Sequence, residues 1–117
     1  MQYLLILYSN ESGWSKMTPA EQEQGMGAYA AFTEALKKAG ALAGSNRLQP
    51  ISAATTVRVA NGKTQVLNGP YADSKEQLGG YYLIDVPDLD AAISWAARCP
   101  TASHGIVEVR PIWAYPA

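Results

Sequence analysis

The six residues Tyr3–Tyr8, with the sequence YLLILY, constrain the fold more than any other segment of this 117-residue chain. A short, continuous apolar run with aromatic ends is typical of a β-strand that is buried on both faces. Gly80–Val86 is a second apolar and aromatic segment and is predicted to form a similar strand. The sheet that contains these strands should therefore need a cover on each of its faces.

Two helices are predicted from their capping residues. Thr18 can cap the first helix and Glu21 completes a capping box, after which apolar residues recur at helical spacing until Gly40 ends the helix. Asp88 is the expected cap of a shorter helix over Leu89–Arg98, which a proline follows. The chain should therefore contain one long and one short helix.

A β-hairpin is predicted between these helices. The segments Thr55–Ala60 and Lys63–Leu67 alternate and are rich in β-branched residues. The dipeptide Asn61-Gly62 joins them and favours a type I′ turn, because both residues tolerate positive φ. The preceding segment Ala41–Pro50 is small and contains glycine, so it is expected to be irregular, with a short strand near Leu42 as the alternative.

The order of the predicted elements defines the fold class. A strand, a long helix, a hairpin, a strand, a helix and a last strand over Ile106–Ile112 follow one another in a single domain spanning residues 1–117. Ser9–Lys16 is expected to be a loop. Strands and helices that mix without strict alternation indicate an α+β fold with a mostly antiparallel sheet.

Two helices can cover only one face of such a sheet. The apolar side chains on the other face of Tyr3–Tyr8 and Tyr81–Ile84 then need another cover, and a second copy related by a two-fold axis would provide it. We therefore expect a homodimer. The alternative is a helix-free face in contact with water, which antiparallel sheets permit.

The composition excludes several classes of function. Nine Lys and Arg against ten Asp and Glu give a net charge of −1, which offers no electrostatic footprint for nucleic acid or an anionic membrane. One Cys and one His exclude a disulfide framework and a zinc cluster, so no metal is expected. The chain contains no nucleophile elbow and no Walker motif, and no cofactor is expected. Without a signal peptide or a long apolar run, a cytoplasmic protein is expected.

The last predicted strand carries the first candidate site. Val107 and Val109 alternate with Glu108 and Arg110, so valines that face the helices would turn the charged pair to the other face. There Arg110 could hold an anionic group in a cavity between two subunits, with Glu108 as its counter-charge or as a base. The alternative is a structural ion pair.

Other candidates are single residues. His104 lies in a loop, where it could serve as an acid or base or simply be solvated, and Asp85, near a strand end, has the same two interpretations. Trp14 and Tyr29 could line a pocket or pack in the core. Cys99 is expected to be a small buried residue, because no basic group is evidently paired with it.

The loop over residues 68–80 is the densest feature of the sequence. Its glycines and proline fix the backbone, and Asp73, Lys75 and Glu76 supply charges of both signs. Such a loop could close over a cavity and place Asp73 and Lys75 on a ligand. The alternative is a rigid connector with solvated charges.

The same loop, NGPYADSKEQLGG, resembles the signature D-G-P-F-A-E-[ST]-K-E-Q-L-G-G-[FY] of the DGPF-type branch of the YCII-related domain family. The likeness extends over nearly the whole chain: the Tyr-Leu-Leu start, Trp14 and the segments 30–34, 54–58, 96–100 and 107–111. It implies a ferredoxin-like fold with two helices on one sheet face, paired as a dimeric α+β barrel.

The resemblance implies less about activity. Family members often accompany or are fused to extracytoplasmic-function sigma factors, and some members of the wider superfamily are thought to use a His–Asp pair. Those positions fall here on Tyr29 and Cys99, which cannot act in the same way, since a tyrosine is a weak acid and a thiol lacks a carboxylate. Asn68 also replaces the Asp of the signature.

Three functional hypotheses follow. In the first, a homodimer binds a small polar or anionic molecule between its sheets. In the second, the protein is a cofactor-free lyase or isomerase in which Arg110 anchors the substrate and His104, Asp85 or Glu108 acts as base. In the third, it is a non-catalytic accessory domain in sigma-factor-linked signalling.

Overall fold

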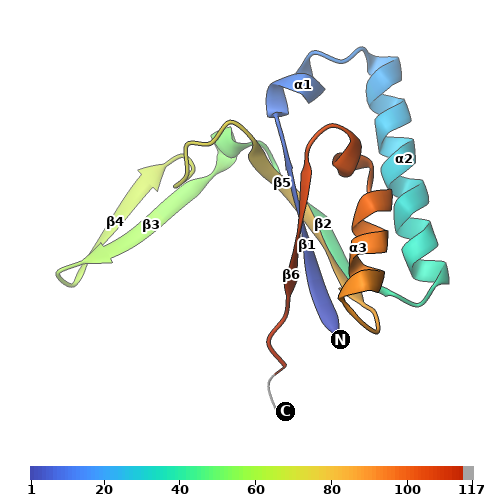
Figure 1. Cartoon of the computed structure of the whole chain (residues 1–117). Coiled ribbons are helices and arrows are strands. Elements are labelled where there is room, and N and C mark those ends of the chain that lie inside the picture. The colour runs from blue at the N-terminus through green and yellow to red at the C-terminus, as the bar shows by residue number, and fades with distance from the viewer. Residues whose placement is uncertain (115–117) are drawn as a thin grey trace.

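The computed structural model describes residues 1–114, which form a four-stranded antiparallel sheet with helices on one face and a two-stranded arm that points away from it (Figure 1). The strands are β1 (Gln2–Ser9), β2 (Leu42–Arg47), β3 (Thr55–Ala60), β4 (Lys63–Asn68), β5 (Gln77–Asp85) and β6 (Ile106–Pro111). The helices are α1 (Glu11–Ser15), α2 (Pro19–Lys38) and α3 (Leu89–Arg98), with 3-10 turns η1 (Ile51–Ala53) and η2 (Pro100–Ser103).

The sheet has the strand order β2-β5-β1-β6, and every neighbouring pair is antiparallel. Along the chain the sheet strands and long helices therefore follow the β-α-β-β-α-β order of ferredoxin-like domains, with the β3–β4 arm inserted between the second and third sheet strands. The predicted α+β fold with an antiparallel sheet and two longer helices on one face is confirmed (Figure 1).

Two segments differ from the leading expectation. Residues 42–47 form the edge strand β2, which bears out the alternative of a short strand near Leu42 over an irregular segment. Pairing with β5 outweighs the weak β-propensity of Gly44, Ser45 and Asn46. The pairing of β2 with β5 shifts register between Leu42 and Gly44. The expected loop over 9–16 contains the short helix α1, whose first turn Asn10 caps by accepting a hydrogen bond from the Ser12 amide.

The predicted helix caps are confirmed. Thr18 Oγ1 accepts a hydrogen bond from the Glu21 amide, and the Glu21 carboxylate accepts one from the Thr18 amide, which completes the capping box of α2. Gly40 follows α2 at φ +68°, a left-handed conformation that favours glycine. Asp88 caps α3 by accepting from the Ala91 amide at 2.9 Å.

The hydrophobic core lies between the sheet and the two long helices. Alternate residues of β1 and β5 point into it and meet the inward faces of α2 and α3. Phe32 of α2 is central, because its ring meets the edges of Tyr82 (5.0 Å between centroids) and Trp95 (6.1 Å). The buried cluster comprises Tyr3, Leu5, Leu7, Phe32, Leu36, Ala41, Tyr82, Ile84, Val86, Ala92, Ala96 and Cys99. Val107 and Val109 pack against this cluster, as predicted.

The opposite face of the sheet carries no described helix (Figure 1). The intervening residues of the central strand, Leu4, Ile6 and Tyr8, point to this side, together with Tyr81 and Leu83 of β5. We call it the helix-free face. Ile6 is 8% exposed, and the other four residues named on this face are half-buried. The centre of this face is therefore apolar.

None of the described helices is both long and apolar enough to cross a membrane.

Gly105 occupies the tightest backbone approach among the described glycines. A Cβ atom at this position would lie 2.2 Å from the carbonyl oxygen of Tyr8, because the turn after η2 presses against the end of β1. No side chain fits there without backbone movement. Gly27, in α2, has no atom within 4 Å of an added Cβ.

We expect Gly105→Ala to lower the free energy of unfolding by about 2–4 kcal/mol, because Tyr8 must move. Gly27→Ala is the matched control and should raise it by about 0.5–1 kcal/mol, since alanine favours the helix. Urea unfolding followed by circular dichroism measures both. Equal effects of the two substitutions would contradict the close approach at Gly105.

The capping box predicts a pH dependence. The hydrogen bond from the Thr18 amide holds the pKa of Glu21 below its ordinary value of 4.5. A carboxylate whose pKa is lower in the folded state stabilises the fold above its ordinary pKa, and this contribution is lost as pH falls through the folded-state pKa. The Glu21→Gln variant keeps the hydrogen-bonding shape without the charge. It should be less stable than the wild type at pH 7, and this difference in urea unfolding should shrink as the pH is lowered below 4.5. A difference that stays constant with pH would contradict the charge effect.

Candidate functional site

Four hydroxyl-bearing side chains meet on the helix side of the sheet. The Tyr29 hydroxyl of α2 and Thr101 Oγ1 of η2 are 2.5 Å apart. One turn further along α2, Thr33 Oγ1 donates to the Tyr29 carbonyl oxygen and lies 2.9 Å from the Tyr82 hydroxyl of β5. Cys99 is buried two residues before Thr101. We call Tyr29, Thr33, Tyr82 and Thr101 the hydroxyl cluster.

Burial controls the protonation of this cluster. Loss of water contact raises the pKa of Tyr29 and of Tyr82, and the hydrogen bonds to their threonine partners oppose the rise only in part. Burial likewise raises the pKa of the Cys99 thiol. All three groups are therefore protonated at neutral pH. The phenols can share or donate protons, and the thiol is the inert buried group that the sequence predicts.

A cation lies beside the cluster. Arg47 ends β2, and its guanidinium stacks over the ring of Trp14 in α1 at 5.0 Å from the ring centroid. Its positive charge also counters part of the rise in the Tyr29 pKa, so the cation acts on the electrostatics of the hydroxyl cluster. No carboxylate within the described residues lies within 4.0 Å of Arg47. The guanidinium edge is therefore free to bind an anion.

The local backbone explains how Trp14 and Arg47 are placed. Arg47 pairs with Gly80 across β2 and β5, and a Cβ at Gly80 would lie 2.8 Å from the Asn46 carbonyl oxygen. Only glycine allows the two strands to approach so closely beside the arginine. Trp14 lies against Gly25 of α2, where an added Cβ would be 3.1 Å from the ring. The indole is thereby wedged between α2 and the arginine.

Together, Trp14, Arg47, Tyr29 and Thr101 form what we call the helix-side site. It offers a planar cation, a protonated phenol and a flat aromatic surface, which suits a small anionic or polar molecule. No group of three or more potential metal ligands occurs among residues 1–114. The cluster contains no carboxylate or imidazole to act as a base, so its chemistry is hydrogen bonding and, at most, proton donation.

The predicted pair Glu108 and Arg110 lies on the helix-free face. Arg110 Nη2 is 3.2 Å from Glu108 Oε2, and the arginine is 69% exposed. Glu108 Oε2 is shielded from solvent and makes no hydrogen bond of good geometry with the described residues. The close pair is an ion pair within one strand, and its carboxylate has hydrogen-bonding capacity to spare.

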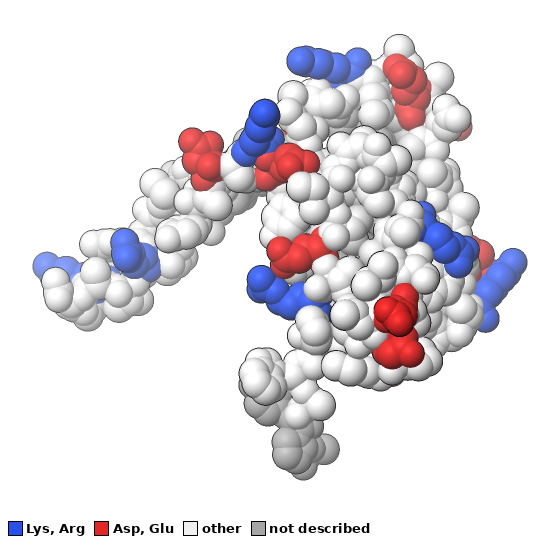
Figure 2. Space-filling view, viewed as in Figure 1, with Lys and Arg blue, Asp and Glu red and all other residues white. Residues whose placement is uncertain are grey.

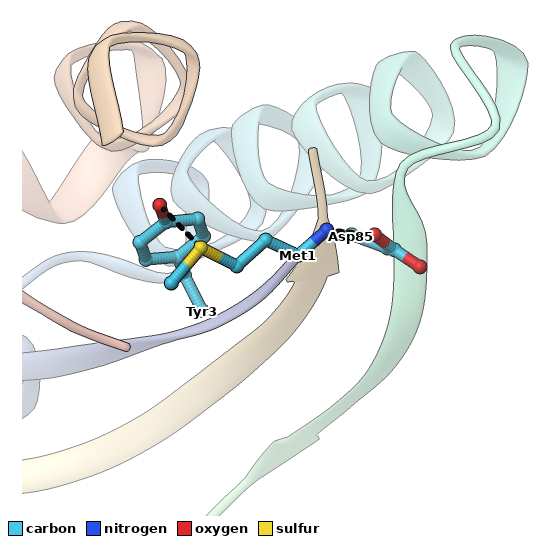
Figure 3. A network of polar contacts seen from close by, with 3 residues as sticks. All are labelled: Met1, Tyr3 and Asp85. Carbon is cyan, nitrogen blue, oxygen red and sulfur yellow. Dashed lines mark hydrogen bonds and ion pairs between the residues drawn. The ribbon is translucent and has the colours of Figure 1, made fainter. Parts of the chain in front are cut away.

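The other predicted acids and bases lie apart from this pair. Asp85 accepts a hydrogen bond at 3.0 Å from the Met1 ammonium group, while the Met1 sulfur accepts one from the Tyr3 hydroxyl (Figure 3). It lies at the end of β5 that pairs with Gln2. His104 is exposed at the opposite end of the sheet, in the turn that precedes β6. Asp85 and His104 are therefore not brought together.

The loop residues Asp73 and Lys75 are both exposed, between the arm and β5. Trp14, by contrast, contacts Arg47, whose charge acts on the Tyr29 hydroxyl. Arg47 and Thr101 were not predicted as site residues from the sequence. Arg47 lies in the segment expected to be irregular, so the direction of its side chain was not predictable. The one available signal was Gly80, whose missing side chain leaves room beside a neighbouring strand.

The fold and the site define an α+β domain with a polar helix-side site and an apolar helix-free face. The pattern of the YCII-related domain family matches residues 1–116, and the chain belongs to this family. An uncharacterized protein of Rhizobium meliloti (strain 1021) is 40% identical over 117 residues, covering 98% of this chain and 94% of the relative.

A solved structure shares the fold. The chain resembles 5-chloro-2-hydroxyhydroquinone dehydrochlorinase (TftG) from Burkholderia phenoliruptrix AC1100, in complex with 2,5-dihydroxybenzoquinone, with a TM-score of 0.56. The likeness covers 99% of this chain and 96% of the other, at 14% sequence identity. At this identity it shows the fold alone.

The hydrogen bond between Tyr29 and Thr101 can be tested by a double-mutant cycle. Thr101 is 1% exposed, so in the Tyr29→Phe variant the buried Thr101 hydroxyl loses this partner. This loss should cost about 1–2 kcal/mol of unfolding free energy. Thr101→Val should cost a similar amount. The double variant should cost less than the sum of the two, because neither partner is then left unpaired. Strictly additive costs in urea unfolding would contradict the contact.

Proposed function

We propose that this YCII-related protein binds a small anionic molecule at the helix-side site, with Arg47 as the residue that holds its charge. The observation that carries the proposal is the Arg47 guanidinium, stacked on Trp14 and without a carboxylate within 4.0 Å among residues 1–114. An arginine held by an aromatic face loses little entropy when it binds, and its planar edge matches a carboxylate with two hydrogen bonds.

The neighbouring hydroxyls support the same proposal. Tyr29 is half-buried and hydrogen-bonded to Thr101, so its phenol is held in one orientation. A protonated phenol can donate a hydrogen bond to an oxygen of the bound molecule. A planar ligand with a carboxylate and a second oxygen would engage Arg47 and Tyr29 together. Small aromatic carboxylates fit this description.

The helix-free face supports a second location for a ligand. If two copies cover this face with each other, the ion pair of Glu108 and Arg110 lies at their seam. Glu108 Oε2, which makes no hydrogen bond of good geometry, would accept one from a polar molecule enclosed there. The support for this location is weaker than for the helix-side site, because Arg110 is already paired with Glu108.

We also propose that the protein is a homodimer in which two helix-free faces meet as a dimeric α+β barrel. The apolar centre of this face, at Leu4, Ile6 and Leu83, supports the proposal, because sheets that pack face to face bury such residues. The likeness of residues 68–80 to the DGPF-type signature supports placing the chain in that branch of the family.

Arg47→Ala tests the ligand proposal, with benzoate, 4-hydroxybenzoate and salicylate as probes and benzyl alcohol as the neutral comparison. A carboxylate at about ten times its dissociation constant should stabilise the wild type by about 1.4 kcal/mol and raise its melting midpoint by about 4–6 °C. Loss of the charged hydrogen bonds in Arg47→Ala should weaken binding about 10–100-fold.

Arg98→Ala is the matched control, because Arg98 stacks over Trp95 at 4.3 Å in the same manner and is exposed. It should bind the probes like the wild type. The proposal fails if none of the carboxylates raises the midpoint of the wild type, or if Arg47→Ala and Arg98→Ala respond alike.

A further inference from the structure

The β3–β4 arm is the largest part of the described structure that makes no contribution to the core. Its two strands pair with each other and with no other described strand, and none of their residues is buried (Figure 1). The radius of gyration is 16.3 Å, whereas a compact chain of this length has a value of about 13 Å. The arm accounts for this extended shape.

The arm has one apolar face. Directly paired residues share a face of a hairpin, so Val57, its partner Val66, and Val59 point to the same side. Their exposed fractions lie between 61% and 66%. The other side carries Arg58 and Lys63, with Leu67 as its one large apolar residue (58% exposed). A two-stranded hairpin is at best marginally stable alone in water, and this one leaves its valines uncovered.

Hydrogen bonds close the base of the arm, and one more joins the segment before it to the body. The Gly69 amide donates to the Ala54 carbonyl oxygen at 2.8 Å, and Thr56 Oγ1 donates to the Gly69 carbonyl oxygen at 2.7 Å. Glu11 of α1 accepts a hydrogen bond from the Ile51 amide, which ties η1 to the body. The first two bonds close the base of the hairpin, and the bond to Glu11 is the one of the three that reaches the body. The valine face of the arm needs a cover from another molecule.

We propose that the valine face of the β3–β4 arm packs on a second copy of this chain, so that the two protomers exchange arms. The arm points away from α2 and α3, on the side of the sheet that has no helix, so a copy that covers the helix-free face lies within its reach (Figure 1). The inference extends the proposed homodimer and does not depend on the ligand site.

Charge complementarity favours a second copy as the occupant. Arg58 and Lys63 are the only charged residues in 55–68, and they lie toward the free end of the arm (Figure 2). All ten Asp and Glu residues and the other seven Lys and Arg residues lie outside the arm, so the arm carries +2 and the rest of the chain −3. Arg58 and Lys63 lie on the side of the hairpin opposite the valines, so they do not contact the second copy directly. The opposite net charges of the arm and the body still attract each other across the thin hairpin, and a two-fold axis makes this attraction reciprocal.

The triple variant Val57→Thr/Val59→Thr/Val66→Thr tests the arm. Threonine keeps the β-branched shape and the strand preference of valine but exposes a hydroxyl, so the hairpin should still form while its apolar face is lost. Because both protomers lose three apolar contacts, the dimer dissociation constant should rise at least about 100-fold. Light scattering and sedimentation over a concentration series measure it.

The matched control is Gln65→Thr, on the opposite side of the same hairpin, and its dissociation constant should stay within about twofold of the wild type. Far-UV circular dichroism checks that each variant folds. The wild type offers a second test that needs no substitution. Its β3 and β4 amides should exchange hydrogen at least about tenfold more slowly at concentrations where the dimer forms than at concentrations where the protein is monomeric.

Specific dimers of standard size are populated at about 10 µM. A wild type that is monomeric at this concentration therefore overturns both the arm exchange and the proposed homodimer. A dimeric wild type whose dissociation constant is unchanged in the triple variant overturns the arm exchange alone. Carboxylate binding by Arg47 is measured separately, so neither result bears on it.

Discussion

A four-stranded sheet covered by two helices has one covered face and one uncovered face, and the rest of this structure depends on that asymmetry. The core is one-sided: Leu5 and Tyr82 are buried beneath the helices, while Leu4 and Leu83 point the other way. The buried polar residue Thr101 lies on the helix side, where Tyr29 is its hydrogen-bond partner. Apolar groups that lack cover collect on the opposite side and on the arm.

The sequence determined most of the fold because its signals are local. The capping box at Thr18, the Asn61-Gly62 turn and the cap at Asp88 each act within a few residues, and each is present as predicted. The strand β2 was predicted only as an alternative, near Leu42, because Gly44 and its polar neighbours have no strand signal of their own. They become a strand only through pairing with β5, which is a contact across the fold.

The candidate site was predictable only in part, for the same reason. Trp14 and Tyr29 attract attention as aromatic residues, but a sequence does not show that an arginine stacks on one and a threonine bonds to the other. The Tyr29–Thr101 contact joins positions 72 residues apart. Arg47 takes its place only because Gly80 lets two strands approach. The orientation of Glu108 and Arg110, by contrast, follows from the simple alternation of residues along β6. In the structure Val107 and Val109 pack against the core, and the charged pair lies on the helix-free face.

The two edges of the sheet have a consequence for behaviour at high concentration. Exposed edge strands invite another chain to add a strand, which is a route to aggregation. In β2 the register shift between Leu42 and Gly44 interrupts a regular edge. In β6 the Ile112 amide donates a hydrogen bond inward to the Gln2 carbonyl oxygen. The backbone N of the preceding residue therefore faces the open edge of the sheet, and because that residue is Pro111 it has no N–H to pair with another strand. Sheet growth into fibres is therefore disfavoured, although large apolar surfaces remain exposed.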